Sequence, residues 1–275
     1  MINYNFNIDI NPDLKEKLLK LKDIIKDNKS AVIAFSGGVD STFLATVSFQ
    51  VLKEKCIAVT NFSSLMPERE FYEAKKLAKL IGIKFDSIQI EEVNNPLFTK
   101  NPVNRCYFCK KNLYEKLLQY AKENNYNSVF DGSNISDDMD YRPGQLALKE
   151  LKIVSPLKMA NLTKEDIRIL SGFYNLPTKD KPSLACLASR IPYNDEITKD
   201  KIKIVEKSED FLYSLGFKNT RVRLHNNIAR IEIDKNQFFD IIENKDRIID
   251  YFKKLGIVYI TLDLEGYRTG SMNIF

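Results

Sequence analysis

The amino-acid sequence predicts an α/β fold, in which a parallel sheet carries helices on both faces, followed by a small α+β domain. Short apolar runs alternate with helical patterns over the first part of the chain, and this alternation is typical of parallel sheets. After about residue 195 the pattern changes to helix, hairpin, helix and strand. We therefore expect two domains, residues 1–195 and residues 196–275.

The first domain contains four apolar runs that we interpret as strands: 31–35, 56–60, 85–90 and 128–131. Helical spacing of apolar residues predicts helices over 41–53, 67–81, 107–122, 145–151 and 164–174. Pro67 and Gly82 mark the two ends of one of these helices. Thr163 with Asp166 resembles a capping box at the start of another.

The second domain has a different order of elements. Helices are predicted over 198–215 and 237–255, and strands over 221–225, 228–233 and 257–264. Asn226-Asn227 separates two runs of alternating polarity, which is a hairpin signal.

Composition excludes several classes of protein. The 275 residues carry a net charge of +5, a mild excess that suits an anionic small molecule better than nucleic acid. No stretch approaches the ~20 apolar residues of a membrane helix, and the polar start lacks the apolar segment of a signal peptide. Four cysteines do not make a disulfide framework, so we expect a reducing, cytoplasmic location. We also expect a homo-oligomer, with neither nucleic acid nor a membrane as partner.

The segment Ser36–Ser41 (SGGVDS) lies between a predicted strand and a predicted helix. Its two glycines permit unusual backbone angles and close approach of a ligand, while its serines and the helix N-terminus supply donors for an anion. Asp40 is unexpected beside an anion unless Mg²⁺ bridges the two. The segment lacks the lysine of a Walker A loop, and a glycine-rich turn with a helix cap is the alternative.

Two further segments follow predicted strands. Asp131–Asn134 (DGSN) lies at the edge where open α/β sheets bind ligands, and Gly132 would let the backbone approach a nucleotide. Thr60-Asn-Phe62 follows the second strand. An ordinary loop is the alternative for either segment alone.

The cysteines suggest a metal or redox site. Cys106 and Cys109 form a C-x-x-C pair, Cys186 is a third candidate, and Cys56 lies in a strand as an inert core thiol. The pair is compatible with a redox couple, half a zinc site or two of three cluster ligands. Zinc would require a fourth ligand, and the single histidine is His225. Three thiolates alone suit a [4Fe–4S] cluster with one open iron.

Arginines gather in the second domain. Arg221 and Arg223 share one face of a strand because alternate side chains point the same way. Arg230 lies on the next strand, and Arg268 follows the last one. A fork of guanidinium donors of this kind binds a phosphate group, and solvent-facing charge on a hairpin is the alternative.

The SGGVDS segment resembles the signature of PP-loop ATP pyrophosphatases, which have the adenine nucleotide alpha hydrolase-like fold. This resemblance implies cleavage of ATP between its α and β phosphates. A substrate oxygen becomes adenylylated, and pyrophosphate leaves from the loop. It also implies that the segment containing Thr60 and Phe62 holds adenine and ribose.

Over nearly the whole chain the sequence is similar to the LarE family of ATP-dependent sulfur transferases. The similarity rests on the motifs SGGVDS, RCYFCK, DGSN with Asp137-Asp138, RPG (142–144), PSLACLASRIPY, VRLHNNIARIEI and LDLEGYRTGSMN. It implies adenylylation of a carboxylate of pyridinium-3,5-biscarboxylic acid mononucleotide, then conversion to a thiocarboxylate used in the nickel-pincer nucleotide cofactor. Some members sacrifice the sulfur of one cysteine. Others carry three cysteines and resemble cluster enzymes, and Cys106, Cys109 and Cys186 place this chain with them.

The expected cofactors are ATP, Mg²⁺ and a [4Fe–4S] cluster, with sulfide or another donor as sulfur source. The catalytic candidates are Cys186, Asp40 and Ser41. The expected ATP site consists of Ser36, Gly37, Gly38, Asp40, Ser41, Thr60, Phe62, Gly132 and Asn134. The substrate site consists of Ser189, Arg190, Arg221, Arg223 and Arg268. The alternatives are a tRNA thiolation enzyme with the same loop, or a non-enzymatic nucleotide-binding module with structural zinc.

Overall fold

The computed structural model describes residues 10–139, 143–182, 185–268 and 271–272. The chain divides into two compact units. Unit 1 comprises Met1–Ile90 and Asn104–Leu184, and unit 2 comprises Glu91–Val103 and Ala185–Phe275. The larger segment of unit 2 thus begins at residue 185, whereas the sequence suggested a boundary after 195. Six residues of the sequence motifs lie outside the described ranges: Arg142, Ser183, Leu184, Thr269, Gly270 and Asn273.

Unit 1 is built on a four-stranded parallel sheet with the order β3-β2-β1-β4. The strands are β1 (Ala31–Ala34), β2 (Cys56–Asn61), β3 (Lys84–Ile88) and β4 (Ser128–Phe130). Each lies within two residues of its predicted position, which confirms the parallel sheet. The carboxyl ends of all four strands meet at one edge, and that edge carries the candidate nucleotide site.

The helices of unit 1 are α1 (Pro12–Asp27), α2 (Val39–Leu52), α3 (Glu68–Ile81), α5 (Arg105–Glu123), α6 (Gly144–Glu150), α7 (Pro156–Met159) and α8 (Lys164–Phe173). The predicted capping box of α8 is present, with Thr163 and Asp166 bonding each other's backbone amides. Helix α1 was not predicted, although Asn11 caps it and Pro12 occupies its first turn. None of the described helices is long and apolar enough to cross a membrane.

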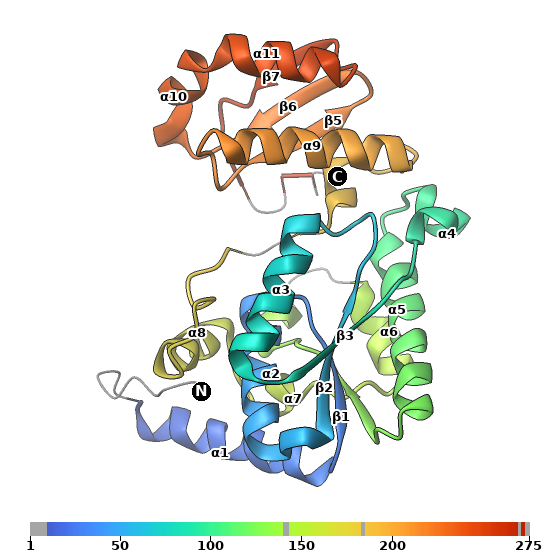
Figure 1. Cartoon of the computed structure of the whole chain (residues 1–275), viewed down its shortest axis with the longest axis vertical. Coiled ribbons are helices and arrows are strands. Elements are labelled where there is room, and N and C mark those ends of the chain that lie inside the picture. Colours follow the sequence, from blue (N-terminus) through green and yellow to red (C-terminus); the bar gives the residue numbers. More distant parts are fainter. Residues whose placement is uncertain (1–9, 140–142, 183–184, 269–270, 273–275) are drawn as a thin grey trace. The chain divides into compact units, whose positions relative to one another are not determined.

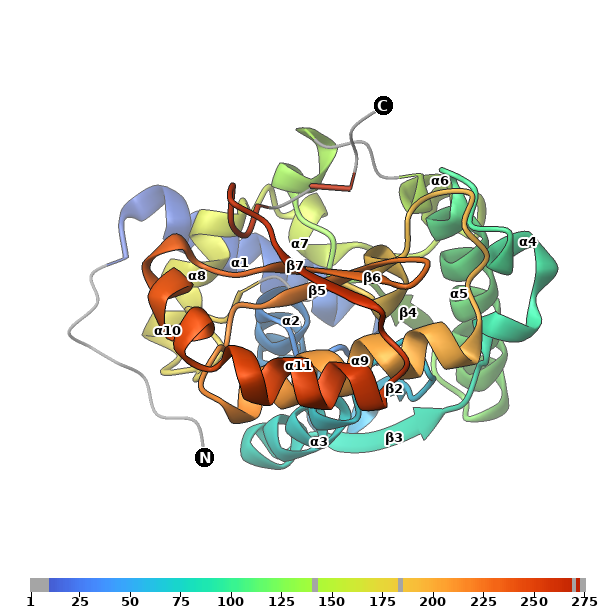
Figure 2. The same cartoon turned by 90° about the horizontal axis from the view of Figure 1, so that it is seen from above.

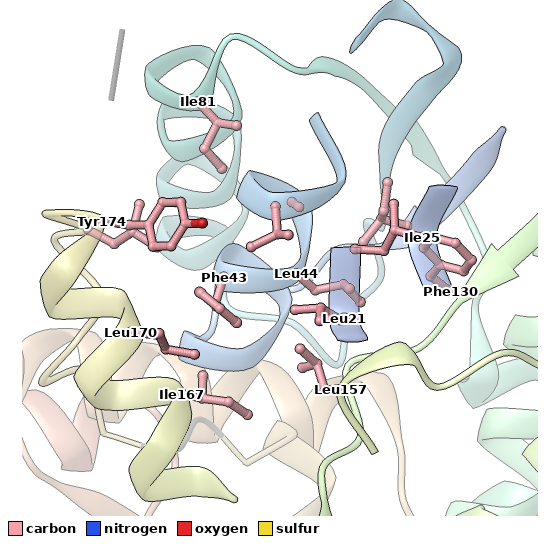
Figure 3. Packing of buried hydrophobic residues seen from close by; sticks show 14 of the residues in the cluster. Leu21, Ile25, Phe43, Leu44, Ile81, Phe130, Leu157, Ile167, Leu170 and Tyr174 are labelled. Carbon is pink, nitrogen blue, oxygen red and sulfur yellow. The ribbon is translucent and has the colours of Figure 1, made fainter. Parts of the chain in front are cut away.

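Helices cover both faces of this sheet, as predicted (Figure 1). Alternate side chains of β1 enter separate cores. Ala31 and Ile33 pack in a core with residues of α1, α2, α3 and α8, and Figure 3 shows part of this packing around Phe43 and Tyr174. Val32 packs on the other face with residues of α5 and α6. The two cores hold β1 rigidly, and therefore also the loop that follows it.

Unit 2 contains a three-stranded sheet with the order β5-β6-β7. Its strands are β5 (Arg221–His225), β6 (Ile228–Glu232) and β7 (Tyr259–Leu262), and its helices are α4 (Pro96–Thr99), α9 (Lys199–Ser214), α10 (Phe238–Glu243) and α11 (Lys245–Lys254). β5 and β6 form the predicted antiparallel hairpin, and β7 is parallel to β6. Figure 2 shows α9 and α11 along one face of the sheet, where the rings of Phe211 and Tyr251 stack with centroids 4.1 Å apart.

The helix predicted over 237–255 is instead two helices, α10 and α11, separated at Asn244. The Asn244 side-chain amide donates to the Asp240 carbonyl at 2.8 Å. Asparagine side chains compete in this way with helical backbone bonds, which explains the break.

The early segment 91–103 belongs to unit 2 because Asn101 ties it to the start of that unit. The buried side-chain amide of Asn101 donates to the backbone carbonyls of Ile191, Pro192 and Asp195 at 3.3, 2.6 and 3.0 Å. The backbone carbonyl of Asn101 accepts from the backbone N–H of Asn194 at 3.0 Å. These bonds join residues about ninety positions apart, so sequence patterns gave no sign of them.

Candidate active site

The loop Ser36–Ser41 joins β1 to α2 and is closed by its own hydroxyl groups. The Oγ atoms of Ser36 and Ser41 are 3.1 Å apart, and the Gly38 amide donates to the Ser36 Oγ at 3.3 Å. Gly37 has a φ of +69°, and a Cβ there would lie 3.0 Å from that of Ala74, so a side chain does not fit. Gly38 has an ordinary φ of −78°. Amides and hydroxyls thus gather at the α2 N-terminus, an arrangement that binds phosphate.

Asp40 lies in the first turn of α2 and is held by two side chains from elsewhere in unit 1. Its Oδ2 accepts from the Lys164 Nζ at 2.5 Å, and its Oδ1 accepts from the Asn134 amide at 3.4 Å. Burial raises the pKa of Asp40, the Lys164 charge and hydrogen bond act against this rise, and the Asp137 charge adds to it. The Asp40 and Asp137 carboxylates are hard oxygen donors, the kind of ligand that fits Mg²⁺.

The segment Asp131–Asn134 packs directly against the phosphate loop. A Cβ on Gly132 would lie 3.4 Å from the Ser41 amide nitrogen, so the backbone at Gly132 lies close to the loop. Its approach to a nucleotide stays a prediction. The buried Asp131 accepts from the Ser133 amide at 2.7 Å and from the Tyr114 hydroxyl at 2.5 Å. Burial would raise the pKa of Asp131, but the Lys110 charge and these hydrogen bonds hold it below its ordinary value.

Thr60 and Phe62 flank the end of β2. The Thr60 hydroxyl is buried and donates to the Phe35 carbonyl at 2.6 Å, so it joins β2 to the segment entering the loop. Phe62 is 36% exposed, and its ring lies 4.4 Å from that of Phe71. Nucleotide binding at either residue stays a prediction.

Two lysines of this site were missed by sequence reasoning. Lys164 is the first residue of α8 and pairs with Asp40. A positive charge at a helix N-terminus is unfavourable in the field of the helix dipole. A lysine at this position was therefore a signal that its charge pairs with a carboxylate elsewhere. Lys181 donates to the Gly37 carbonyl at 3.2 Å. Its place just before the PSLAC motif was the available hint.

The three candidate cluster cysteines are distributed over both units. Cys106 (exposed) and Cys109 (partly buried) lie in the first turns of α5 in unit 1, and Cys186 (exposed) lies in unit 2. None of the three forms a disulfide, and thiolates are the usual cluster ligands, so their chemistry fits an iron–sulfur cluster. Within the described ranges, no group of three or more His, Cys, Asp or Glu side chains is placed to hold a metal ion. The cluster therefore belongs to the proposal below.

Cys56 is a core thiol, as predicted. Its side chain is buried in β2, and burial raises the pKa of this thiol to about 12. A thiol that stays protonated is a poor nucleophile and a poor metal ligand.

Unit 2 buries several arginines among few carboxylates. Arg190 bonds both oxygens of Glu209, at 2.9 and 3.0 Å. Arg223 bonds the Glu232 Oε2 through two nitrogens, at 3.1 and 2.8 Å, and also donates to the Ser189 carbonyl at 3.1 Å. Ser189 contacts both arginines, because its hydroxyl accepts from Arg190 and its carbonyl accepts from Arg223. Three of the predicted substrate-site residues, Ser189, Arg190 and Arg223, therefore lie together. Both guanidinium groups are already engaged, a feature that the strand pattern did not predict.

Arg221 differs from these two arginines. It is buried at 6% exposure, and its guanidinium lies 5.1 Å from the centre of the Tyr267 ring. Burial, followed by the nearby Arg190 charge, lowers its pKa. The Glu209 charge acts against this lowering, and the guanidinium donates to the Thr220 carbonyl at 2.8 Å. Arg268, half-buried, pairs with Glu265.

Replacing Arg223 by alanine is expected to lower the free energy of unfolding by about 3–5 kcal/mol, because the fully buried Glu232 loses its strongest partner. Urea unfolding of the variant measures this loss. Glu265→Ala, which removes an exposed carboxylate, serves as control and should change stability by less than about 1 kcal/mol. Equal stabilities of the two variants would contradict a structural role for Arg223.

A parallel α/β sheet with a serine- and glycine-containing loop after its first strand defines a PP-loop nucleotide-binding enzyme. In agreement, the NAD synthase family model matches residues 14–138. The pyridinium-3,5-bisthiocarboxylic acid mononucleotide synthase of Lactiplantibacillus plantarum is 35% identical to this chain over 94% of the chain and 95% of its own length. An uncharacterised protein of Synechocystis sp. is 42% identical over 94% of the chain and 98% of its own length. The chain belongs to the LarE family.

Proposed function

We propose that this protein is an ATP-dependent sulfur transferase that converts a carboxylate of pyridinium-3,5-biscarboxylic acid mononucleotide into a thiocarboxylate for the nickel-pincer nucleotide cofactor. The observation that carries the proposal is the phosphate loop with Asp40 held between Lys164 and Asn134. The full-length similarity to the Lactiplantibacillus plantarum enzyme supports the choice of substrate.

The loop activates the carboxylate by supporting adenylylation. A carboxylate oxygen is a poor leaving group, and transfer of AMP to it makes it a good one. The Ser36 and Ser41 hydroxyls and the α2 amides bind the departing pyrophosphate. Asp40, with Asp137 nearby, would hold Mg²⁺, which when bound neutralises phosphate charge.

Cys106, Cys109 and Cys186 would hold a [4Fe–4S] cluster that carries the sulfur for transfer. When bound, that cluster supplies an open iron for an external sulfide. The thiols of Cys106 and Cys186 are exposed, so both are accessible for assembly. Cys186 lies three residues before Ser189 in the chain, and Ser189 contacts both Arg190 and Arg223. The sulfur-bearing segment is thus continuous with the proposed phosphate site.

Unit 2 would bind the phosphate of the substrate nucleotide. Arg221, Arg223, Arg190 and Ser189 form the proposed site, with Arg268 at its side. Glu209 and Glu232 orient two of these guanidinium groups by charge-assisted hydrogen bonds. Arg221 is our candidate for the direct contact, because burial, followed by the Arg190 charge, lowers its pKa, and a phosphate charge beside it would act in the opposite direction.

Replacing Arg221 by lysine is expected to raise the KM for the pyridinium nucleotide roughly tenfold and to leave the KM for ATP unchanged. Lysine keeps the charge but loses the planar fork that binds phosphate through two parallel hydrogen bonds. Initial-rate measurements with each substrate varied in turn give both constants. Arg247→Lys, on the exposed side of α11, is the matched control. Equal effects on both KM values would place Arg221 outside the substrate site.

The decisive assay combines ATP, the pyridinium dicarboxylate nucleotide and sulfide without oxygen, and reads the products by mass. AMP, pyrophosphate and a thiocarboxylate are expected. Turnover of a tRNA in place of the nucleotide would favour the tRNA thiolation alternative. ATP binding without pyrophosphate release, together with bound zinc, would favour the non-enzymatic module.

The proposal extends to the setting of the enzyme. Cysteines that form no disulfide are typical of a reducing compartment, so we place the protein in the cytoplasm. We also propose a homo-oligomer, which light scattering of the purified protein tests directly.

A further inference from the structure

The Lys181 side chain links the phosphate loop to helix α3. Its Nζ donates to the Gly37 carbonyl at 3.2 Å, to the Glu70 Oε2 at 2.9 Å and to the Glu73 Oε2 at 3.0 Å. Both glutamates belong to α3, and Ala74 of the same helix packs against Gly37. The Lys181 side chain is mostly buried, at 15% exposure. A single ammonium group therefore joins the loop to the start of α3.

The peptide between Gly37 and Gly38 has two distinct sides. Its carbonyl accepts from Lys181, and its N–H donates to the Ser36 Oγ inside the loop. The C=O and N–H of a trans peptide point in opposite directions, so a flip of this peptide would turn an oxygen toward a bound anion. Glycine on both sides removes the Cβ atoms that would resist such a flip. The bond from Lys181 opposes it.

We propose that Lys181 is a positioning residue for the pyrophosphate group: its ammonium holds the Gly37 carbonyl away from the interior of the loop, so that the Gly38 N–H stays on the inner side, beside the Ser36 hydroxyl that would bind the anion. This inference rests on the proposed function, because pyrophosphate is the ligand that the loop would release. Lys181 is suited to the task because its charge persists. Burial lowers its pKa, but Glu70 and Glu73 outweigh burial and raise it above the ordinary value.

The backbone of this segment is anchored independently of the ammonium. The Arg168 guanidinium of α8 donates to the carbonyls of Lys179 and Lys181. Removing the Lys181 side chain therefore leaves the segment attached, and the role of the ammonium can be tested separately.

The test compares the binding of magnesium pyrophosphate and of adenosine to the full chain by calorimetry. In Lys181→Met, which keeps the length of the side chain, pyrophosphate binding is expected to weaken about tenfold or more, as for loss of a hydrogen bond to a charged group. Adenosine binding should stay unchanged, because it does not use the loop and it reports an intact fold. Equal pyrophosphate affinity in the variant and the wild type would overturn the inference. Failure of the wild type to bind pyrophosphate would instead count against the proposed function.

Two further variants test whether the effect of Lys181 comes from its hydrogen bond to Gly37, from its net charge, or from the anchoring of its backbone. Lys181→Met combined with Glu73→Gln has the same local net charge as the wild type, and its pyrophosphate binding should remain weak. Recovery of wild-type affinity in this double variant would show that Lys181 acts by charge alone and would refute the positioning role. Arg168→Gln removes the backbone anchor and should keep pyrophosphate affinity. A loss there equal to that of Lys181→Met would assign the effect to the anchor and overturn the inference.

Discussion

Replacing Asp40 by alanine is expected to reduce ATP turnover by at least about 10²–10³-fold, as for removal of one electrostatic group from an active site. The Asp40 carboxylate is the group through which the loop would hold Mg²⁺ against the phosphates. Without it, Lys164 also loses its partner at 2.5 Å. The pyrophosphate would then leave with its charge less well neutralised, so the chemical step slows.

Chromatography of the nucleotides formed by the variant and the wild type measures this effect, with AMP as the expected product. The fold should survive, because the Asp40 side chain is one-quarter exposed and the sheet is held by two apolar cores. Asp86→Asn is the matched control, since this exposed carboxylate on β3 accepts from the Tyr120 hydroxyl and from the Ser87 amide, both outside the phosphate loop. ADP as the main wild-type product would contradict pyrophosphate chemistry, and full activity of Asp40→Ala would exclude Asp40 from the site.

Local signals in the sequence predicted the fold well. Buried parallel strands are continuous apolar runs, which is why β1 and β2 were located correctly. The capping box of α8 and the Asn226-Asn227 hairpin are also short-range features that need no tertiary information. Helix α1 has comparable short-range signals in Asn11 and Pro12, although it was not predicted.

Long-range partners were beyond prediction. Lys164 lies 124 positions from Asp40, and Lys181 lies 144 positions from Gly37. Nothing in the local pattern of either lysine identifies its partner, because the contact exists only after the helices pack on the sheet. The same holds for Arg190 and Glu209. The sequence predicted which residue types gather, while the pairing depends on tertiary structure.

Replacing any one of Cys106, Cys109 and Cys186 by serine is expected to abolish cluster assembly, so that iron and acid-labile sulfide per protein fall to background. A serine hydroxyl is a much weaker ligand for iron than a thiolate. Cys56→Ser is the matched control, because its buried thiol, with a pKa of about 12, stays protonated. Iron and sulfide analysis of protein purified without oxygen gives the result independently of activity. Unchanged iron in all four variants would exclude these cysteines as ligands.

The source of the transferred sulfur decides whether the protein works once or repeatedly. A cysteine that gives up its own sulfur is destroyed, whereas three thiolates that retain a cluster allow external sulfide to be used and replaced. With ATP, substrate and excess sulfide, one protein molecule should therefore make several product molecules, and the Cys186 peptide should keep its mass. Dehydroalanine at Cys186, seen as a loss of about 34 Da after one turnover, would establish the sacrificial mechanism instead. The exposed position of Cys186 makes both outcomes readable by peptide mass, since its thiol is accessible in the folded protein.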